Sequence, residues 1–284
     1  MQTRNKGLIL SFIGVLILSP DSLLIRLVDL DDFSLIFYRS ALPIITILIF
    51  LIYTYQKSFF NSFYLIGIPG IIYAILYAIT HICFVYSIQN TAVANTLVLI
   101  ASAPIFAALF SVFILKEVPS LFTWIVILIA MFAMIIIGVG SFTTTGLYGD
   151  LMALIVAIGM GFSMVLVRLF KNKDLVPACL LGCLISALYA LPFGINFDLN
   201  NDQFVLIFIM CLILLPIPFM IMTISPKFAP AHEVALIFLL ESVLGTTWVW
   251  FVIKEVPPLN TIIGGILLLG SVTIFIYQTT KKSN

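Results

Sequence analysis

The sequence predicts an all-α polytopic membrane protein whose ten transmembrane helices form two inverted five-helix repeats. Three observations support this prediction. Of the 284 residues, 63% are hydrophobic and only 9% are charged, whereas a soluble domain has about 25% charged residues. Apolar stretches long enough to cross a bilayer follow one another along the chain. The motif Lys-Glu-Val-Pro ends two of these stretches, at Lys116 and at Lys254, which lie 138 residues apart.

A membrane helix needs about 20 mostly apolar residues. Polar residues, proline and glycine divide the chain into ten such segments, at roughly 7–27, 33–55, 64–87, 91–115, 122–140, 147–169, 177–195, 203–224, 231–253 and 260–278. Arg4 and Lys6 precede the first segment, as basic residues precede the apolar core of a signal peptide. No small-x-small cleavage site follows, so we expect this segment to remain as the first helix. The connections are too short to hold a soluble domain.

Lys and Arg gather in alternate connections. With the N-terminus in the cytoplasm, ten of the 13 basic residues fall in cytoplasmic segments: Arg4, Lys6, Lys57, Lys116, Arg168, Lys171, Lys173, Lys227, Lys281 and Lys282. Cytoplasmic connections of membrane proteins are enriched in these residues. We therefore expect both termini in the cytoplasm, and an integral protein of a membrane such as the bacterial inner membrane.

The two Lys-Glu-Val-Pro ends indicate an internal repeat. A second match supports it, because residues 7–27 resemble residues 149–169, with Gly7 over Gly149 and Arg26 over Arg168. We expect one repeat at 1–142 and the other at 143–284, and an odd number of helices per repeat inverts the second copy. Inverted repeats are typical of secondary transporters, which bind substrate near the midplane between the repeats. The alternative is chance similarity between helices rich in Leu and Ile.

These segments resemble the drug/metabolite transporter superfamily, EamA type. The resemblance covers nearly the whole chain and includes Arg39 in FYRSALP, the stretch ASAPIFAALFSVFILKE with Pro104 and Glu117, and AHEVALIFLLESVLGTTWVWFVIKE in the second copy. Leu240-Glu241-Ser242 stands where the family often has Leu-Glu-Pro, so the proline that would kink this helix is missing. The resemblance implies ten helices in two inverted repeats and the export or exchange of small metabolites, amino acids or drug-like compounds.

Charged side chains within a membrane helix cost about 2.5–3.5 kcal/mol and are candidates for function. Asp21 and Arg39 both lie roughly 9 Å below the outer boundary, at 1.5 Å per residue, so they can form an ion pair that clamps two helices. Asp21 is alternatively a gating or proton-linked acid, beside a bend at Pro20, which lacks a backbone N–H.

Further candidates lie deeper in the apolar segments. Glu241 is near the middle of 231–253 and shares a face with Trp248; we expect both to line a cavity, the alternative being a bond to a neighbouring helix. His81 follows Tyr77 at a four-residue step, which would suit an organic solute with a ring or an amine, or a packed aromatic stripe. Asn95 and Ser102 share a face of 91–115, where such groups bond across helices or line a cavity.

The first hypothesis for function is a secondary transporter, an exporter of small organic metabolites that works by alternating access. Its cavity would be lined by the segments that begin at 7, 64, 91, 147, 203 and 231. Proton exchange through Asp21 or Glu241, and the choice between monomer and homodimer, remain open. The alternatives are an intramembrane enzyme, which would need a nucleophile with its base, and a channel, which would need a ring of charges or carbonyls.

Other classes of function lack support in the sequence. The net charge of +1 and the absence of a basic run give no reason to expect nucleic acid as a partner. Four cysteines, at 83, 179, 183 and 211, lie in apolar stretches, and Cys179 and Cys183, which share a helix face, have no acid or histidine near them in sequence. We expect them to be small buried residues, with no disulfide and no metal site. No cofactor is expected.

Overall fold

The computed structural model describes residues 2–91, 93–138, 146–254 and 259–281. Every regular element in these ranges is helical, which confirms the all-α class. The elements are α1 (Gln2–Leu18), α2 (Asp21–Val28), α3 (Asp32–Tyr55), η1 (Gln56–Ser58), α4 (Phe59–Asn90), α5 (Val93–Ile100), α6 (Ala103–Phe110), η2 (Ser111–Leu115), α7 (Leu121–Gly138), α8 (Leu147–Leu169), α9 (Val176–Ala190), η3 (Leu191–Phe193), α10 (Asn201–Ile209), η4 (Met210–Leu214), α11 (Pro216–Ile224), η5 (Ser225–Lys227), α12 (Ala231–Phe238), α13 (Leu240–Ile253) and α14 (Leu259–Lys281). The repeat boundary, expected between residues 142 and 143, lies outside the described residues. So do Glu255 and Lys282.

Several helices, alone or joined end to end, are long and apolar enough to span a bilayer. Within the described ranges, nine stretches have the length and composition of a membrane span. One of them, Asp32–Asn90, has 59 residues and includes both α3 and α4, which pack against each other after the chain turns at η1. The chain is therefore a polytopic membrane protein, while the number of ten spans remains a prediction.

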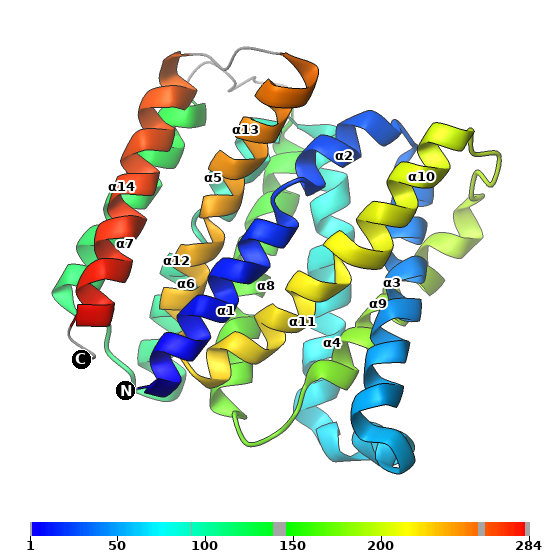
Figure 1. Ribbon diagram of the computed structural model, residues 1–284, viewed down its shortest axis with the longest axis horizontal. Coiled ribbons are helices and arrows are strands. Elements are labelled where there is room, and N and C mark those ends of the chain that lie inside the picture. Colours follow the sequence, from blue (N-terminus) through cyan, green and yellow to red (C-terminus); the bar gives the residue numbers. More distant parts are fainter. Residues whose placement is uncertain (1, 92, 139–145, 255–258, 282–284) are drawn as a thin grey trace.

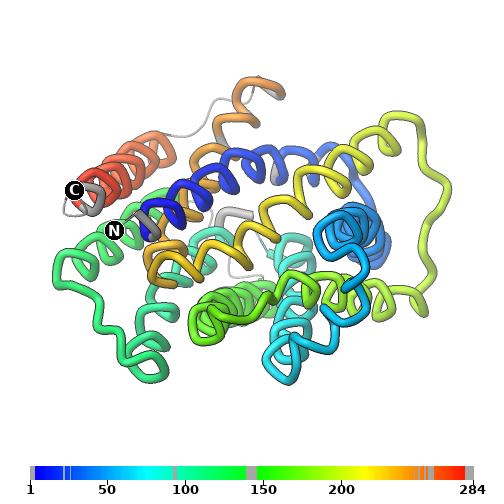
Figure 2. The backbone as a smooth tube through the Cα atoms, turned by 60° about the horizontal axis from the view of Figure 1, so that its bottom comes forward, coloured from blue at the N-terminus to red at the C-terminus, as the bar shows by residue number. Residues whose placement is uncertain are grey.

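The helices form a slab with a pair at one edge and a group at the other. α7 and α14 pack together at one edge, and α3, α9 and α10 lie toward the opposite edge (Figure 1). Between them, α1 runs beside α11, and α4 packs on α8, as the turned view also shows (Figure 2). Both termini lie at the same end of the helices (Figure 1).

The two halves of the chain are interleaved. α8 of the second half packs on α4 and α6 of the first, and α1 packs on α11 and α12. α3 likewise pairs with α9, and α7 pairs with α14. The middle of the molecule is therefore an interface between the halves.

Three of the expected membrane segments are broken near their middle. α1 ends before Pro20, which precedes the first residue of α2, and α5 ends shortly before Pro104, which lies in the first turn of α6. The third break, at Leu239 between α12 and α13, has no proline. There the backbone N–H of Leu239 bonds to Leu236 O, and that of Ser242 bonds to Leu239 O. The missing proline left a kink here in doubt. The structure shows an interruption of the helix, where bonds to the third preceding residue tighten the turn.

The repeated Lys-Glu-Val-Pro motif ends its two helices in the same way. Lys116 has φ 57° and ψ 23°, and Lys254 has φ 63° and ψ 17°. Both lysines are thus left-handed residues that stop a helix. α5–α6 runs toward the end that holds the termini, whereas α12–α13 runs away from it (Figure 1). The same local signal therefore works in two segments of opposite direction.

Candidate functional site

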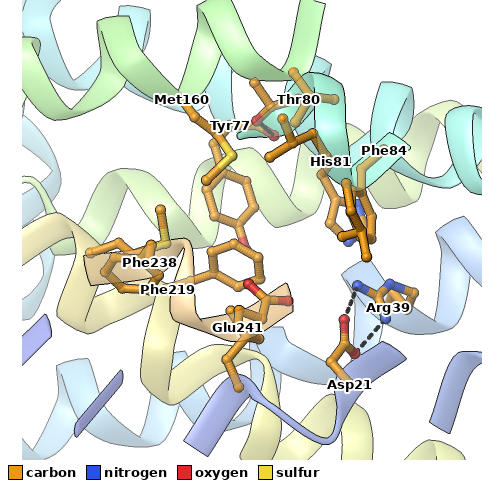
Figure 3. A pocket seen from close by; sticks show the side chains of 15 residues that line it. Asp21, Arg39, Tyr77, Thr80, His81, Phe84, Met160, Phe219, Phe238 and Glu241 are labelled. Atoms are coloured by element: carbon orange, nitrogen blue, oxygen red, sulfur yellow. Dashed lines mark hydrogen bonds and ion pairs between the residues drawn. The ribbon is translucent and has the colours of Figure 1, made fainter. Parts of the chain in front are cut away.

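A cavity of about 90 Å³ lies between the halves. It is lined by Leu18, Asp21, Arg39, Tyr77, Thr80, His81, Phe84, Leu97, Ile100, Val156, Met160, Phe219, Met222, Phe238 and Glu241. These residues come from the six segments expected to line a cavity and, through Arg39, also from α3. Figure 3 shows ionisable side chains and aromatic rings facing the same space.

Asp21 and Arg39 form a buried ion pair at one end of the cavity. Nη1 of Arg39 donates to Oδ1 of Asp21 at 2.7 Å, and Nη2 donates to Oδ2 at 3.0 Å (Figure 3). The side chains are only 3% and 1% exposed. The Arg39 guanidinium also lies 5.6 Å from the centre of the Phe84 ring. The break after α1 places Asp21 at the start of α2, within reach of an arginine two turns into α3.

Glu241 is a second acid on the cavity. It is the second residue of α13, directly after the break at Leu239, and its carboxyl group points into the cavity (Figure 3). Among the residues that the structure describes, Glu241 makes no hydrogen bond and no ion pair. An unpaired charge at this depth is costly, so the carboxyl group is either neutral or balanced by something that enters the cavity.

His81 and Tyr77 lie on the wall formed by α4. Their rings stack with centres 6.2 Å apart and planes 7° apart. His81 Nδ1 is 3.2 Å from Ser40 Oγ, while His81 Nε2 is buried and has no hydrogen-bond partner among the residues described. The Cys183 thiol donates to the Tyr77 hydroxyl at 3.6 Å. Tyr77 also lines a smaller hollow of about 40 Å³, whose other walls come mainly from α8 and α11.

The structure places the other candidate residues away from the cavity lining. Asn95 is buried and donates to Thr91 Oγ1 at 3.3 Å, and Ser102 donates to Leu99 O at 2.6 Å. Trp248 is 43% exposed, and its Nε1 donates to Ser19 Oγ at 2.9 Å. Pro20 does not line the cavity either, but it precedes the first residue of α2 and so sets the position of Asp21.

Several aromatic and sulfur-containing lining residues were missed by the sequence analysis. Phe84, Phe219, Phe238 and Met160 all face the cavity, but apolar residues of this kind fill every segment of the chain. A helical step offered one signal, since Phe84 is three residues after His81 and Phe238 is three before Glu241.

A second, wider hollow of about 770 Å³ lies at the end of the molecule that holds the termini. We call it the vestibule; it is lined by Arg4, Glu117, Val118, Pro119, Ser120, Thr123, Arg168, Lys171, Lys227, Phe228, Pro230, His232 and Glu233. Arg4 pairs with Glu233, and Arg168 pairs with Glu117 at 3.1 Å. Arg168 Nη1 also donates to Lys227 O at 3.3 Å. The two bonds of Arg168 join α8 to the segment after η2 and to η5.

Asp174 lies beside the vestibule, in the connection between α8 and α9. It accepts hydrogen bonds from the Tyr55 hydroxyl and from Lys227 Nζ, the latter at 3.1 Å. Burial raises the pKa of this carboxyl group, but the bonds from Tyr55, Lys227 and the Val176 N–H together outweigh burial, so its pKa is lowered from 3.8. Asp174 therefore ties α3, α9 and η5 together as a carboxylate.

Comparison with known proteins follows the same division of the chain. The EamA-like transporter family matches residues 5–139 and, a second time, residues 147–277. The chain is 27% identical over 232 residues to the uncharacterized transporter YdfC of Bacillus subtilis, covering 78% of this chain and 73% of that protein. It is 24% identical over 259 residues to the pseudopaline exporter CntI of Pseudomonas aeruginosa, covering 88% of this chain and 87% of that protein.

A solved crystal structure shares the fold. It superposes with a TM-score of 0.79 over 99% of this chain and 100% of that chain, at 15% sequence identity. At this identity the likeness supports the helical arrangement alone. The two family matches lie on either side of residues 140–146, near the boundary expected from the repeated motifs.

Proposed function

We propose that this chain, which belongs to the EamA-like transporter family and is a membrane transporter, exports small organic metabolites by alternating access. The family and its relatives are transporters, a class that is generally not enzymatic. The cavity between the halves would be the solute site, reached from one side of the membrane at a time.

The observation that carries this proposal is the position and size of the cavity. Its walls come from both halves of the chain, from Leu18 to Ile100 in the first and from Val156 to Glu241 in the second. Sites for drug-sized ligands measure about 300–1,000 Å³, whereas this cavity measures about 90 Å³. A drug-sized solute therefore requires the halves to move apart. Because both halves form the walls, this would be a movement of one half relative to the other.

The two halves would be inverted repeats, 1–142 and 143–284, with ten helices in all. The double family match and the opposite directions of α5–α6 and α12–α13 support this arrangement. Both termini would lie in the cytoplasm of a bacterial inner membrane, because the basic residues of the vestibule lie at the same end as the termini. Reporter domains fused at each terminus test the orientation, and activity of a periplasmic reporter at either terminus would contradict it.

Flux measurements in proteoliposomes test the transport proposal. Vesicles loaded with a bacterial metabolite extract should lose specific small solutes, identified by mass spectrometry, faster than vesicles without the protein. A carrier accelerates exchange when the same solute is present on the far side, whereas a channel does not. Absence of selective loss would contradict the proposed function.

Proton exchange through Asp21 or Glu241 is a separate part of the proposal. Both acids face the cavity, and only Asp21 has an ion-pair partner among the described residues. Solute flux that does not change when a pH gradient is imposed would remove the proton from the mechanism.

A further inference from the structure

We propose that the cavity binds the protonated amine of an organic solute, with Glu241 as its charge partner. This inference rests on the proposed function, because it names the class of solute for the same cavity. It comes from the balance of charges around the cavity and from the nature of its walls.

Of the two carboxyl groups that face the cavity, one is paired with the arginine and the other is not. Arg39 uses both terminal nitrogens on the two oxygens of Asp21, at 2.7 and 3.0 Å. Glu241 is the remaining charged side chain of the lining, and it has no ion-pair partner among the residues described. An entering ammonium group can balance the carboxylate of Glu241, whereas a carboxylate solute would add a second unpaired negative charge.

The walls opposite the acid suit a cation as well. The rings of Tyr77, Phe84, Phe219 and Phe238 line the same space as Glu241 (Figure 3). Aromatic faces attract ammonium and guanidinium groups, most strongly where the cation is desolvated. Arg39 already lies over Phe84 in this manner, and the Tyr77 ring stacks on His81, so the rings of Phe219 and Phe238 remain for an incoming cation.

The size of the cavity limits what enters in this state. A cavity of about 150 Å³ holds a benzene ring, and the present volume is about 90 Å³. The cavity thus has room for an amine head group with a short substituent, and a larger solute, such as benzylamine, requires the halves to part. A proton competes for the same carboxylate, so binding of the amine would displace a proton from Glu241.

Three probes of similar shape and different charge test the proposal on the purified protein in detergent: benzylamine, benzyl alcohol and benzoate. Isothermal titration calorimetry should show binding of benzylamine to the wild type, and weaker or no binding of the other two. Absence of benzylamine binding would overturn the proposal. Equal affinity for benzyl alcohol would overturn the proposal, because charge would then contribute nothing. Tighter binding of benzoate would also overturn it.

Variants locate the charge. Glu241→Gln keeps the shape of the side chain and should weaken benzylamine binding about 30-fold or more, since losing one partner of a buried charge pair costs about 2–5 kcal/mol. Asp198→Asn is the matched control, because Asp198 is exposed in the connection before α10 and lies outside the cavity. Unchanged affinity in Glu241→Gln would overturn the assignment.

Folding of the variants is checked by size-exclusion chromatography. If Glu241→Gln does not fold, Glu241→Asp keeps the charge and should retain benzylamine selectivity over benzyl alcohol with lower affinity; loss of that selectivity would overturn the assignment. Selective solute exchange in proteoliposomes without amine binding would overturn the amine site and leave the carrier mechanism standing. Amine binding without any solute exchange would instead contradict the proposed function.

Discussion

Arg39 of α3 and Asp21 of α2 are joined by two parallel hydrogen bonds, of 2.7 and 3.0 Å, in a place where both side chains are almost fully buried. The pair closes one end of the cavity and links the short helix α2 to the long helix α3. The two charges balance each other, and Nε of Arg39 is left without a hydrogen-bond partner among the described residues. Glu241 faces the same cavity and has no ion-pair partner in the part of the chain that the structure describes.

Breaking this pair should destabilise the protein strongly. Asp21→Asn leaves the Arg39 charge buried and unpaired, which costs about 3–5 kcal/mol. Thermal unfolding in detergent should therefore show a large loss of stability. The double variant Asp21→Leu/Arg39→Met removes both charges and should recover most of it, because apolar replacement of a buried pair is often neutral. Equal losses in the single and double variants would contradict this account.

Arg168 should hold the vestibule side closed, since it bonds to Glu117 and to Lys227 O. Arg168→Gln removes the ion pair, and we expect greater access from the vestibule to the small hollow that Ser163 lines. Ser163→Cys, added to both backgrounds, should react several times faster with a membrane-impermeant maleimide when Arg168 is replaced. The four natural cysteines are buried and set the baseline.

The matched control for Arg168 is Lys171→Gln. Lys171 lines the same vestibule but makes no ion pair within the described part of the chain. Labelling of Ser163→Cys should be unchanged in this background. Equal acceleration by both substitutions would mean that vestibule charge, rather than the Arg168 bonds, controls access.

Gly182 of α9 allows Tyr77 to approach closely. A Cβ at Gly182 would lie 2.7 Å from Tyr77 Cδ1 and 2.9 Å from its Cβ. Gly182→Ala should therefore destabilise by about 1–3 kcal/mol through overpacking, and it should also change the cavity by moving the Tyr77 ring. Thermal unfolding checks the first effect. Gly270→Ala, where no atom of the described residues lies within 4 Å of the added carbon, should cause no loss.

Asp174 should make stability depend on pH in the acid range. Its pKa is lowered in the folded protein, from 3.8, so its stabilising contribution is present above the pKa of the unfolded chain. The contribution is lost as the pH falls through the lower folded value. Between pH 5 and pH 3, at about the ordinary pKa of Asp, the thermal midpoint of Asp174→Asn should fall less steeply than that of the wild type. Asp198→Asn should follow the wild type, and identical slopes for Asp174→Asn would contradict the role of this carboxylate.

The sequence alone identified the membrane class, the apolar segments and the two Lys-Glu-Val-Pro helix ends. These features are local. A long apolar stretch is enough to mark a membrane helix, and a helix ends through the conformation of the residues directly at its end. The ion pair between Asp21 and Arg39 was also predicted, because both residues lie at the same depth in adjacent segments. Glu241 as a cavity-facing acid followed from its position within an apolar segment.

Only the tertiary structure decided which faces turn inward. It placed Phe84, Phe219 and Phe238 on the cavity and left Asn95 and Trp248 away from its lining. It also broke the helix at Leu239 without a proline. A helix that is apolar on all sides has no polar face that shows how it is rotated about its axis. In a membrane, packing contacts with neighbouring helices determine that rotation. Those contacts join residues from the two halves of the chain, so no stretch of sequence contains them by itself.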